Sequence, residues 1–180
     1  MRVVTAIEEY TPKDEDVCVF LAGGITNCWD WQSAVIGELE KMENTDSLIV
    51  FNPRRPNFPI DDPNAAQEQI EWEYKYLHLA DIFSMYFTSG ESTQPICMYE
   101  LGVHITRSAF DNKPESVIVS VEDGYIRKQD VVIQVGLALK DNPYTNSAVN
   151  PINPVNLHAD AKSHAQLIYD DYISVLESLY

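Results

Sequence analysis

The carboxylate with the least ordinary surroundings is Glu100, in the segment QPICMYELG (94–102). Pro95 suits the first turn of a helix, and on such a helix Glu100 shares a stripe with Ile96 and Val103. A charged group on an apolar stripe is costly unless it is paired or used. Its place in the second turn, near the positive end of the helix dipole, should help to keep the carboxylate ionised.

Glu73, on the predicted helix before this one, is a second carboxylate on an apolar stripe. It lies between Ile70 and Leu77 at helical spacing, so it too is expected on a stripe that faces the sheet or a pocket. Trp72 and Tyr76 form a second apolar strip on this helix, which would suit a subunit contact. From the spacing alone, pairing with a buried arginine or capping of a neighbouring loop is a slightly better interpretation for Glu100, and an ion pair at the rim of the core is an equally good one for Glu73.

The two glutamates lie on the helices before and after the predicted strand 81–87, so both could border one pocket. Paired carboxylates suit glycosyl chemistry, in which one attacks or stabilises an anomeric carbon and the other handles a proton. From the residues alone this is one option among several.

Short apolar runs alternate with helical patterns along the chain. We predict strands at 17–22, 47–51, 81–87 and 116–121, and helices at 29–42, 65–80, 95–108, 131–139 and 159–179. This alternation predicts a single α/β domain over residues 1–180, with a central parallel sheet of about five strands and helices on both faces. Residues 1–15 are expected to form a polar arm or edge element, and residues 140–157 a long loop.

Ligands of such sheets bind beyond the carboxyl ends of the strands. The segments expected there are GGITN (23–27), NPRRPNF (52–58), TSGESTQP (88–95) and EDGYIRK (122–128). The basic doublets Arg54-Arg55 and Arg127-Lys128 could simply lie in solvated loops. The rings of Phe58 or Trp29 could stack on a base.

Composition narrows the classes of partner. The net charge of −16 disfavours nucleic-acid polymers and anionic membranes. No segment is apolar and long enough to span a bilayer, and the N-terminus lacks the features of a signal peptide, so we expect a cytoplasmic protein. Three cysteines without CxxC spacing and four histidines without HExxH argue against a zinc site. The P-loop, GxGxxG and GxSxG motifs are absent.

Four sequence segments, taken in this order, resemble those of a known protein family: FLAGGITNCWDWQ (20–32), NPRRPNF (52–58), QIEWEYKYLHLADIFSMYF (69–87) and QPICMYELG (94–102). Over residues 16–137 the chain resembles the nucleoside 2-deoxyribosyltransferase-like family. The resemblance implies a flavodoxin-like fold, assembly as a dimer or hexamer, and transfer of a 2-deoxyribosyl group between purine or pyrimidine bases, without a metal or cofactor. Deoxynucleosides and free nucleobases would be the small-molecule partners.

The resemblance also implies roles for individual residues. The family nucleophile falls on Glu100, and the acidic residue that handles the base proton falls on Glu73, where family members carry Asp. Gln94 stands where they have a base-contacting Asp, and Phe20 where they have a tyrosine. Asp130 stands near an Asn that a neighbouring subunit supplies to the sugar. The substrate-binding set expected here is Gly23, Gly24, Arg54, Arg55, Phe58, Gln94 and Asp130.

The implied mechanism is a double displacement through a covalent deoxyribosyl-Glu100 intermediate. Two alternatives stay open. One is a hydrolase of 2′-deoxynucleoside 5′-monophosphates, with a phosphate site built from Gly23, Gly24, Ser89 or Arg54. The other is a non-catalytic nucleotide-binding module.

Overall fold

The computed structural model describes residues 1–110, 116–141 and 152–179. Within these residues it contains one sheet and five helices. The strands are β1 (Arg2–Thr5), β2 (Val17–Gly23), β3 (Leu48–Asn52), β4 (Ile82–Phe87), β5 (Ser116–Val121) and β6 (Asn156–Leu157). The helices are α1 (Trp31–Leu39), α2 (Ala65–Leu79), α3 (Pro95–Phe110), α4 (Lys128–Asp141) and α5 (Ala161–Ser178).

The sheet has the order β1-β3-β2-β4-β5-β6, and every neighbouring pair is parallel. The last five strands of this series have the flavodoxin-type order, in which the second strand lies outside the first and the rest follow on the other side. The predicted α/β class is confirmed, but six strands replace the expected five or so. Two strands have no counterpart among the four predicted ranges: β1, which pairs with β3 and comes from the predicted polar arm or edge element, and β6, which pairs with β5.

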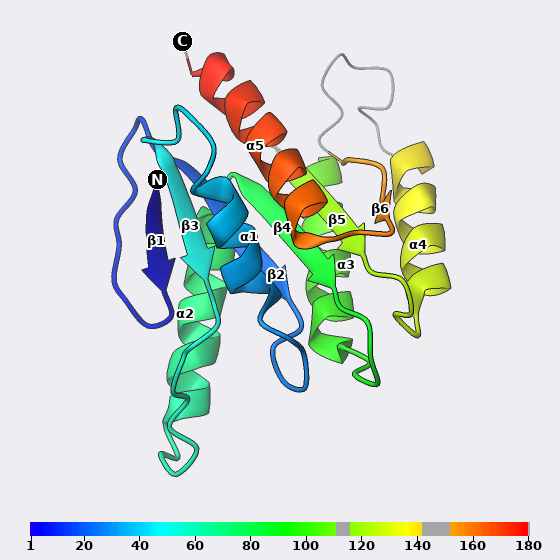
Figure 1. Cartoon of the computed structure of the whole chain (residues 1–180), viewed down its shortest axis with the longest axis horizontal. Helices are drawn as coiled ribbons and strands as arrows, with labels where there is room; N and C mark the ends of the chain where they lie inside the picture. The colour runs from blue at the N-terminus through cyan, green and yellow to red at the C-terminus, as the bar shows by residue number, and fades with distance from the viewer. Residues whose placement is uncertain (111–115, 142–151, 180) are drawn as a thin grey trace.

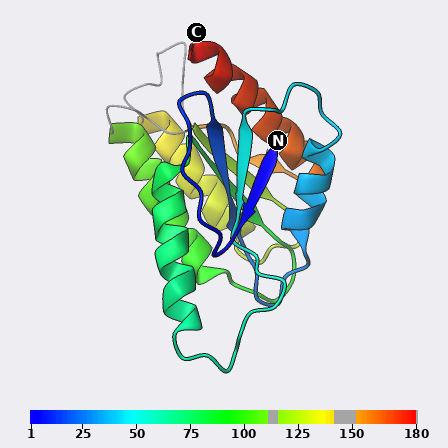
Figure 2. The same cartoon turned by 90° about the vertical axis from the view of Figure 1, so that its left-hand side faces the viewer.

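Helices cover both faces of the sheet, as predicted. In Figure 1, α1 and α5 lie in front of the strands and α2, α3 and α4 behind them; Figure 2 shows the sheet between these two layers. Strand residues therefore alternate between two apolar cores. Phe20, Phe83 and Phe87 point to the three-helix side, whereas Leu21 and Tyr86 point to the side of α1 and α5. Burial on both faces explains why these strands are continuous apolar runs.

The helical stripe of α2 differs from the prediction. Trp72 and Tyr76, expected as a subunit contact, are buried in the core, whereas Ile70 is 63% exposed. The N-terminal segment causes this, because it passes over α2 after leaving β1. The indole N–H of Trp72 donates to the carbonyl of Glu8 (2.8 Å), and the hydroxyl of Tyr76 accepts from the backbone N–H of Tyr10 (2.6 Å).

The predicted long loop 140–157 is only partly a loop. Helix α4 extends to Asp141, and residues 142–151 lie outside the described part of the chain. Ile152 then forms a bridge with Val117, and β6 pairs with the end of β5. The C-terminal helix begins as expected, with a capping box between Asp160 and Ser163.

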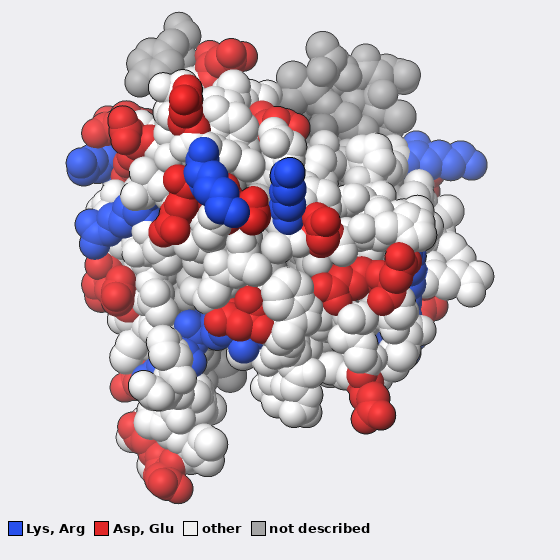
Figure 3. Space-filling model, in the orientation of Figure 1, with Lys and Arg blue, Asp and Glu red and all other residues white. Residues whose placement is uncertain are grey.

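Acidic side chains are spread over the face that α1 and α5 cover, with fewer basic side chains among them (Figure 3). This distribution agrees with the net charge of −16. Among the described helices, none combines the length and the apolar character needed to cross a bilayer.

Candidate active site

Four loops meet at the carboxyl edge of the sheet, as the sequence predicts. They follow β2 (24–30), β3 (53–64), β4 (88–94) and β5 (122–127). From β2 the chain moves to β3 on one side and then to β4 on the other, so the topological switch point lies between β2 and β4. This is the position at which open α/β sheets bind ligands.

Glu73 and Glu100 come from the helices that precede and follow β4, and they lie close enough for their charges to interact. Burial and, to a smaller extent, the negative charge of Glu73 together raise the pKa of Glu100 to about 8. Burial also raises the pKa of Glu73, while a hydrogen bond from Gln69 opposes this shift. The expectation that the dipole of α3 keeps Glu100 ionised is therefore wrong, because desolvation and a like charge outweigh it.

This pair can share one proton near neutral pH. Two neighbouring carboxylates cannot both ionise easily in a buried site, so one of them retains a proton while the other carries the charge. A site of this kind presents a nucleophilic or electrostatically stabilising carboxylate beside a proton donor. Both residues that spacing alone singled out are thus brought together.

The apolar stripe proposed for Glu100 is only partly correct. Ile96 is 65% exposed, whereas Cys97, Leu101 and His104 form the buried face of α3. Glu100 therefore lies at the boundary between the buried and exposed faces, where a ligand can reach it. On α2, Ile70 and Tyr74 are likewise exposed beside Glu73.

Cys97 is a neighbour of the pair that sequence reasoning did not select. Its pKa is raised to about 12, first by burial and then by the charge of Glu100. The side chain therefore stays a neutral thiol near pH 7 and does not compete with Glu100 as a nucleophile. An apolar cysteine three residues before a glutamate offered no signal for this proximity.

Arg54 organises the loop after β2. Its Nε donates to Oε1 of Gln32 (2.8 Å) and lies 3.1 Å from Oδ1 of Asp30, while Nη2 donates to the carbonyl of Trp29 (3.0 Å). A second, longer contact joins Nη2 to the carbonyl of Gly24 (3.4 Å). These acceptors occupy a large part of the guanidinium that was expected to bind substrate.

Arg55 and Phe58 remain available in the loop after β3. The guanidinium of Arg55 stacks over the ring of Phe58, with 5.4 Å between its central carbon and the ring centroid. Nη1 of Arg55 is buried and has no hydrogen-bond partner among the described residues. Phe58 is 43% exposed, so its ring is accessible to a planar ligand.

Gly23 and Gly24 allow close packing of the loops. A Cβ atom at Gly24 would lie 2.5 Å from Sγ of Cys28 and 2.7 Å from Oε1 of Gln94. Gly23 has a φ of +153°, and its backbone packs against Tyr86 and Trp31. Both glycines therefore set the width of the site through loop packing.

Gln94 is buried, with its amide turned toward the end of β4. Its Nε2 donates to the carbonyl and hydroxyl oxygens of Thr88 (2.9 and 3.2 Å), and its Oε1 accepts from the Thr88 N–H (3.4 Å). Its φ of +47° is unusual for a residue with a side chain. Gln94 thus fixes the loop before α3, in addition to the base contact that the resemblance implies for this position.

Asp130 lies on the first turn of α4, half exposed, and pairs with Arg127 (2.9 Å). No contact among the described residues joins Asp130 to Glu73 or Glu100 within the chain. Its exposure leaves it accessible to a second molecule.

Glu122 is a further residue that the sequence prediction missed. Its Oε1 accepts hydrogen bonds from Nε1 of Trp29 and the hydroxyl of Tyr86 (both 2.8 Å). Its Oε2 accepts from the backbone N–H and the hydroxyl of Ser89 (2.7 and 2.8 Å). One carboxylate thereby joins the loops after β2, β4 and β5. Its position directly after a buried strand was the one available signal.

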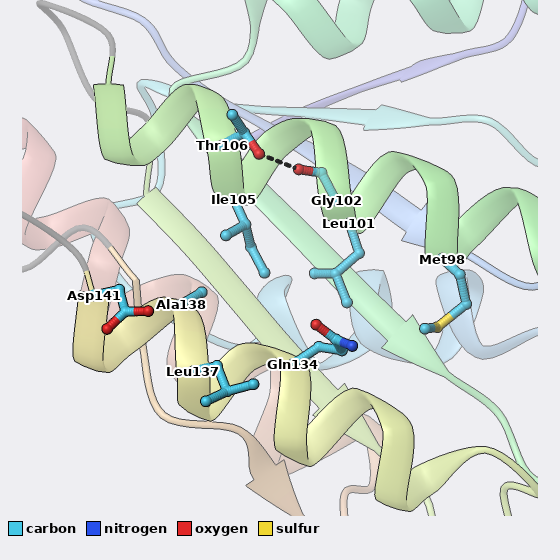
Figure 4. A pocket seen from close by; sticks show the side chains of 9 residues that line it. All are labelled: Met98, Leu101, Gly102, Ile105, Thr106, Gln134, Leu137, Ala138 and Asp141. Carbon is cyan, nitrogen blue, oxygen red and sulfur yellow. Dashed lines mark hydrogen bonds between the residues drawn. The ribbon is translucent and has the colours of Figure 1, made fainter.

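A separate hollow of about 440 Å³ lies between α3 and α4 (Figure 4). Met98, Leu101 and Ile105 line it from α3, and Gln134 and Leu137 from α4. Glu100 is two positions after Met98, which places its side chain about 200° round the helix from that of Met98. The carboxylate pair therefore belongs to a different side of α3 from this apolar groove.

In the described part of the chain, His, Cys, Asp and Glu residues form no group of three or more that could hold a metal ion.

A search of curated proteins returned no match. The family model described as nucleoside 2-deoxyribosyltransferase like matches residues 16–125, which is 110 of the 180 residues and includes both glutamates, the first three loops and most of the fourth. With its parallel sheet, switch point and paired carboxylates in the positions that the motifs predict, this chain belongs to the nucleoside 2-deoxyribosyltransferase-like family.

Proposed function

We propose that this protein transfers the 2-deoxyribosyl group of a 2′-deoxynucleoside from one nucleobase to another. The observation that carries the proposal is the half-buried pair of Glu73 and Glu100, in which desolvation and the neighbouring charge favour a state with a proton on one carboxyl group near pH 7. Transfer needs this protonation state, because one group must attack as a carboxylate while the other acts as an acid.

In the first half-reaction an ionised Oε of Glu100 attacks C1′ of the sugar. The C1′–N bond breaks, and its electron pair goes to the departing base, which takes a proton from Glu73. Positive charge that develops at C1′ lies beside Glu100 and favours the distribution with the proton on Glu73 and the negative charge on Glu100. The product is a glycosyl ester of Glu100 and a free base.

In the second half-reaction a nitrogen of the incoming base attacks C1′ and displaces the Glu100 carboxylate. The incoming base gives its proton to Glu73, which restores the starting protonation state. Two inversions retain the configuration at C1′ overall. Arg55 and Phe58 are suited to hold the planar base, since the ring is exposed and a guanidinium N–H is unpartnered.

Hydrolysis of 2′-deoxynucleoside 5′-monophosphates is the second candidate, and the loop contacts disfavour it. The phosphate donors expected at Ser89 both bind the Glu122 carboxylate, and the guanidinium of Arg54 contacts Gln32, Trp29 and Asp30. A phosphate here would have to displace these acceptors and approach the negative charge of Glu122.

Incubation with a 2′-deoxynucleoside, with and without a second free base, tests the proposal. We expect a new nucleoside to appear when the acceptor base is present. Free 2-deoxyribose that accumulates at the same rate in both reactions, or sugar phosphate released from the monophosphate alone, would establish hydrolysis instead.

The Glu100→Ala variant separates an enzyme from a nucleotide-binding module. Loss of the nucleophile should reduce turnover about a thousandfold or more, equivalent to about 4 kcal/mol of transition-state stabilisation. If the wild-type protein binds deoxynucleosides but shows no turnover with any base, it is a nucleotide-binding module and not an enzyme.

The proposal includes self-association. Ile70 and Tyr74 on α2, and Ile96 and Tyr99 on α3, are each more than 60% exposed and lie on the two helices that carry the carboxylates. A second copy that covers them would also exclude water from the glycosyl ester. Light scattering after size-exclusion chromatography should give a mass at least twice the 20.4 kDa of one chain.

A further inference from the structure

Gln69 lies one helical turn before Glu73 and contacts it directly. Its amide nitrogen is 2.7 Å from the backbone carbonyl oxygen of Pro53 and 2.7 Å from Oε1 of Glu73. The Pro53 carbonyl belongs to the loop after β3, so one side chain connects that loop to the carboxylate.

The Pro53 carbonyl fixes which end of the amide faces Glu73. A backbone carbonyl oxygen can only accept, so the NH₂ group of Gln69 must point toward it. The second hydrogen of the same NH₂ group then points at Oε1 of Glu73. Turning the amide over would place Oε1 of Gln69 against two acceptors. The present orientation is kept although it leaves Oε1 of Gln69 buried without a hydrogen-bond partner.

We propose that Gln69 is a positioning residue that holds Oε1 of Glu73 as a hydrogen-bond acceptor, so that the acidic proton of Glu73 lies on Oε2 and faces the departing base. An oxygen that already accepts an N–H is the less favourable place for the proton of a carboxylic acid. The inference rests on the proposed function for the direction in which Oε2 delivers its proton.

The proton balance follows directly. When the C1′–N bond breaks, the Oε2–H bond of Glu73 breaks with it and the proton goes to the base. Gln69 then donates to a carboxylate instead of a neutral acid, and this hydrogen bond strengthens as the charge develops. Gln69 thereby stabilises the ionised product form of Glu73 without itself losing a proton.

Other ionisable groups also act on this carboxyl group. From α3, Glu100 carries a like charge that interacts with Glu73, and the thiol of Cys97 lies near both. In the described part of the chain, Gln69 is the group that hydrogen-bonds to Glu73 from α2. A test must therefore separate the effect of Gln69 from the proton that Glu73 and Glu100 share.

The same helix supplies a matched control. Gln67 donates to Oε1 of Glu71 at 2.7 Å, with the same four-residue spacing, but this pair is exposed. Gln69 and Gln67 therefore make the same local contact in different surroundings. Substitution of Gln67 should change neither the titration of Glu73 nor the reaction.

The first experiment needs no turnover. Carboxyl carbons of ¹³C-glutamate-labelled protein are titrated by NMR in the Glu100→Gln background, and Glu73→Gln assigns the Glu73 signal. Gln69→Met, similar in length but without a donor, should raise the midpoint of Glu73 by about one pH unit. Gln69→Lys, which retains a donor and adds a positive charge, should lower it, and Gln67→Met should leave it unchanged. Thermal melts establish that each variant is folded.

The second experiment measures base release from two substrates with different leaving groups, in protein that retains Glu100. A 2′-deoxynucleoside with a neutral base needs a proton on departure, whereas the base of 7-methyl-2′-deoxyguanosine is already cationic and leaves as neutral 7-methylguanine without one. Gln69→Met should reduce kcat about ten- to hundredfold for the neutral base, a fraction of what a general acid supplies. For the 7-methyl substrate the loss should be less than about threefold.

Opposite midpoint shifts in the two Gln69 variants, with a loss confined to the neutral base, support the proposal. An unchanged Glu73 midpoint in both variants, or equal losses on both substrates, overturns it. A wild type that releases no base refutes the proposed function, and the NMR titration then still decides whether Gln69 controls Glu73.

Discussion

His164 should make the protein sensitive to acid. Its imidazole is fully buried between two serines: Nε2 lies 2.7 Å from Oγ of Ser84, and Nδ1 lies 2.7 Å from Oγ of Ser120. Oγ of Ser120 also accepts from the amide of Asn156 (3.1 Å), so its own proton can serve Nδ1. Trp31 packs edge-on against the ring. The site therefore holds a neutral imidazole.

Desolvation lowers the pKa of His164 from 6.5 to about 3. Because the folded-state pKa is depressed, the unfolded chain binds the proton more readily, and stability is lost as pH falls below 6.5. The loss is about 1.4 kcal/mol per pH unit until pH 3. At pH 4.5 it amounts to about 2.7 kcal/mol relative to neutral pH, a large part of a typical folding free energy of about 5–15 kcal/mol.

Urea unfolding between pH 7.5 and 4.5, followed by tryptophan fluorescence, measures this loss. The raised pKa values of Glu73 and Glu100 act in the opposite direction, because they make the folded state bind protons above pH 4.5. The comparison must therefore be the difference between wild type and His164→Gln, which cannot titrate at this position but can still hydrogen-bond to both serines.

We expect the difference in unfolding free energy between wild type and His164→Gln to fall by about 2.7 kcal/mol from pH 7.5 to 4.5. Parallel curves for His164→Gln and wild type would refute the reasoning, since the buried imidazole would then titrate as it does in the unfolded chain.

Three further predictions concern the site. Gly24→Ala should displace Gln94, because the added Cβ would lie 2.7 Å from its Oε1; a loss of about 1–3 kcal/mol should appear in urea melts together with reduced turnover. Glu122→Ala removes the acceptor of four hydrogen bonds and should lower the unfolding free energy by about 2 kcal/mol, whereas Glu122→Gln should cost less. Glu73→Gln removes a like charge, so the midpoint of the Glu100 carboxyl signal in an NMR titration should fall below about 8 yet stay above 4.5 through burial.

Much of the fold could be predicted because parallel strands buried on both faces are continuous apolar runs. VCVFLA and SLIVF indicate strands without any knowledge of their partners. The short, partly exposed β1 lacks such a run and could be predicted only as part of a polar arm or edge element. The phase of α2 was also ambiguous, since the helix has apolar residues on two sides, and only the path of residues 6–10 decides that Trp72 is buried.

The carboxylate pair could be predicted because it depends on topology: helices on either side of one strand place Glu73 and Glu100 near each other. The contacts of Arg54, Gln94 and Glu122 could not, because they depend on loop paths. A basic residue in a ligand-side loop gives the same sequence signal whether it binds substrate or a neighbouring carbonyl. The role of Gln69 was hidden for a similar reason, since Gln67 has the same spacing to a glutamate.

The outermost strands limit how copies of this protein can join. β1 has four residues and β6 has two, so each border of the sheet offers few unpaired backbone groups. Short borders hinder the strand-to-strand addition that leads to open-ended fibres. In the self-association proposed above, contacts between copies would therefore be made by side chains on helices and loops, where shape and charge can select the fit.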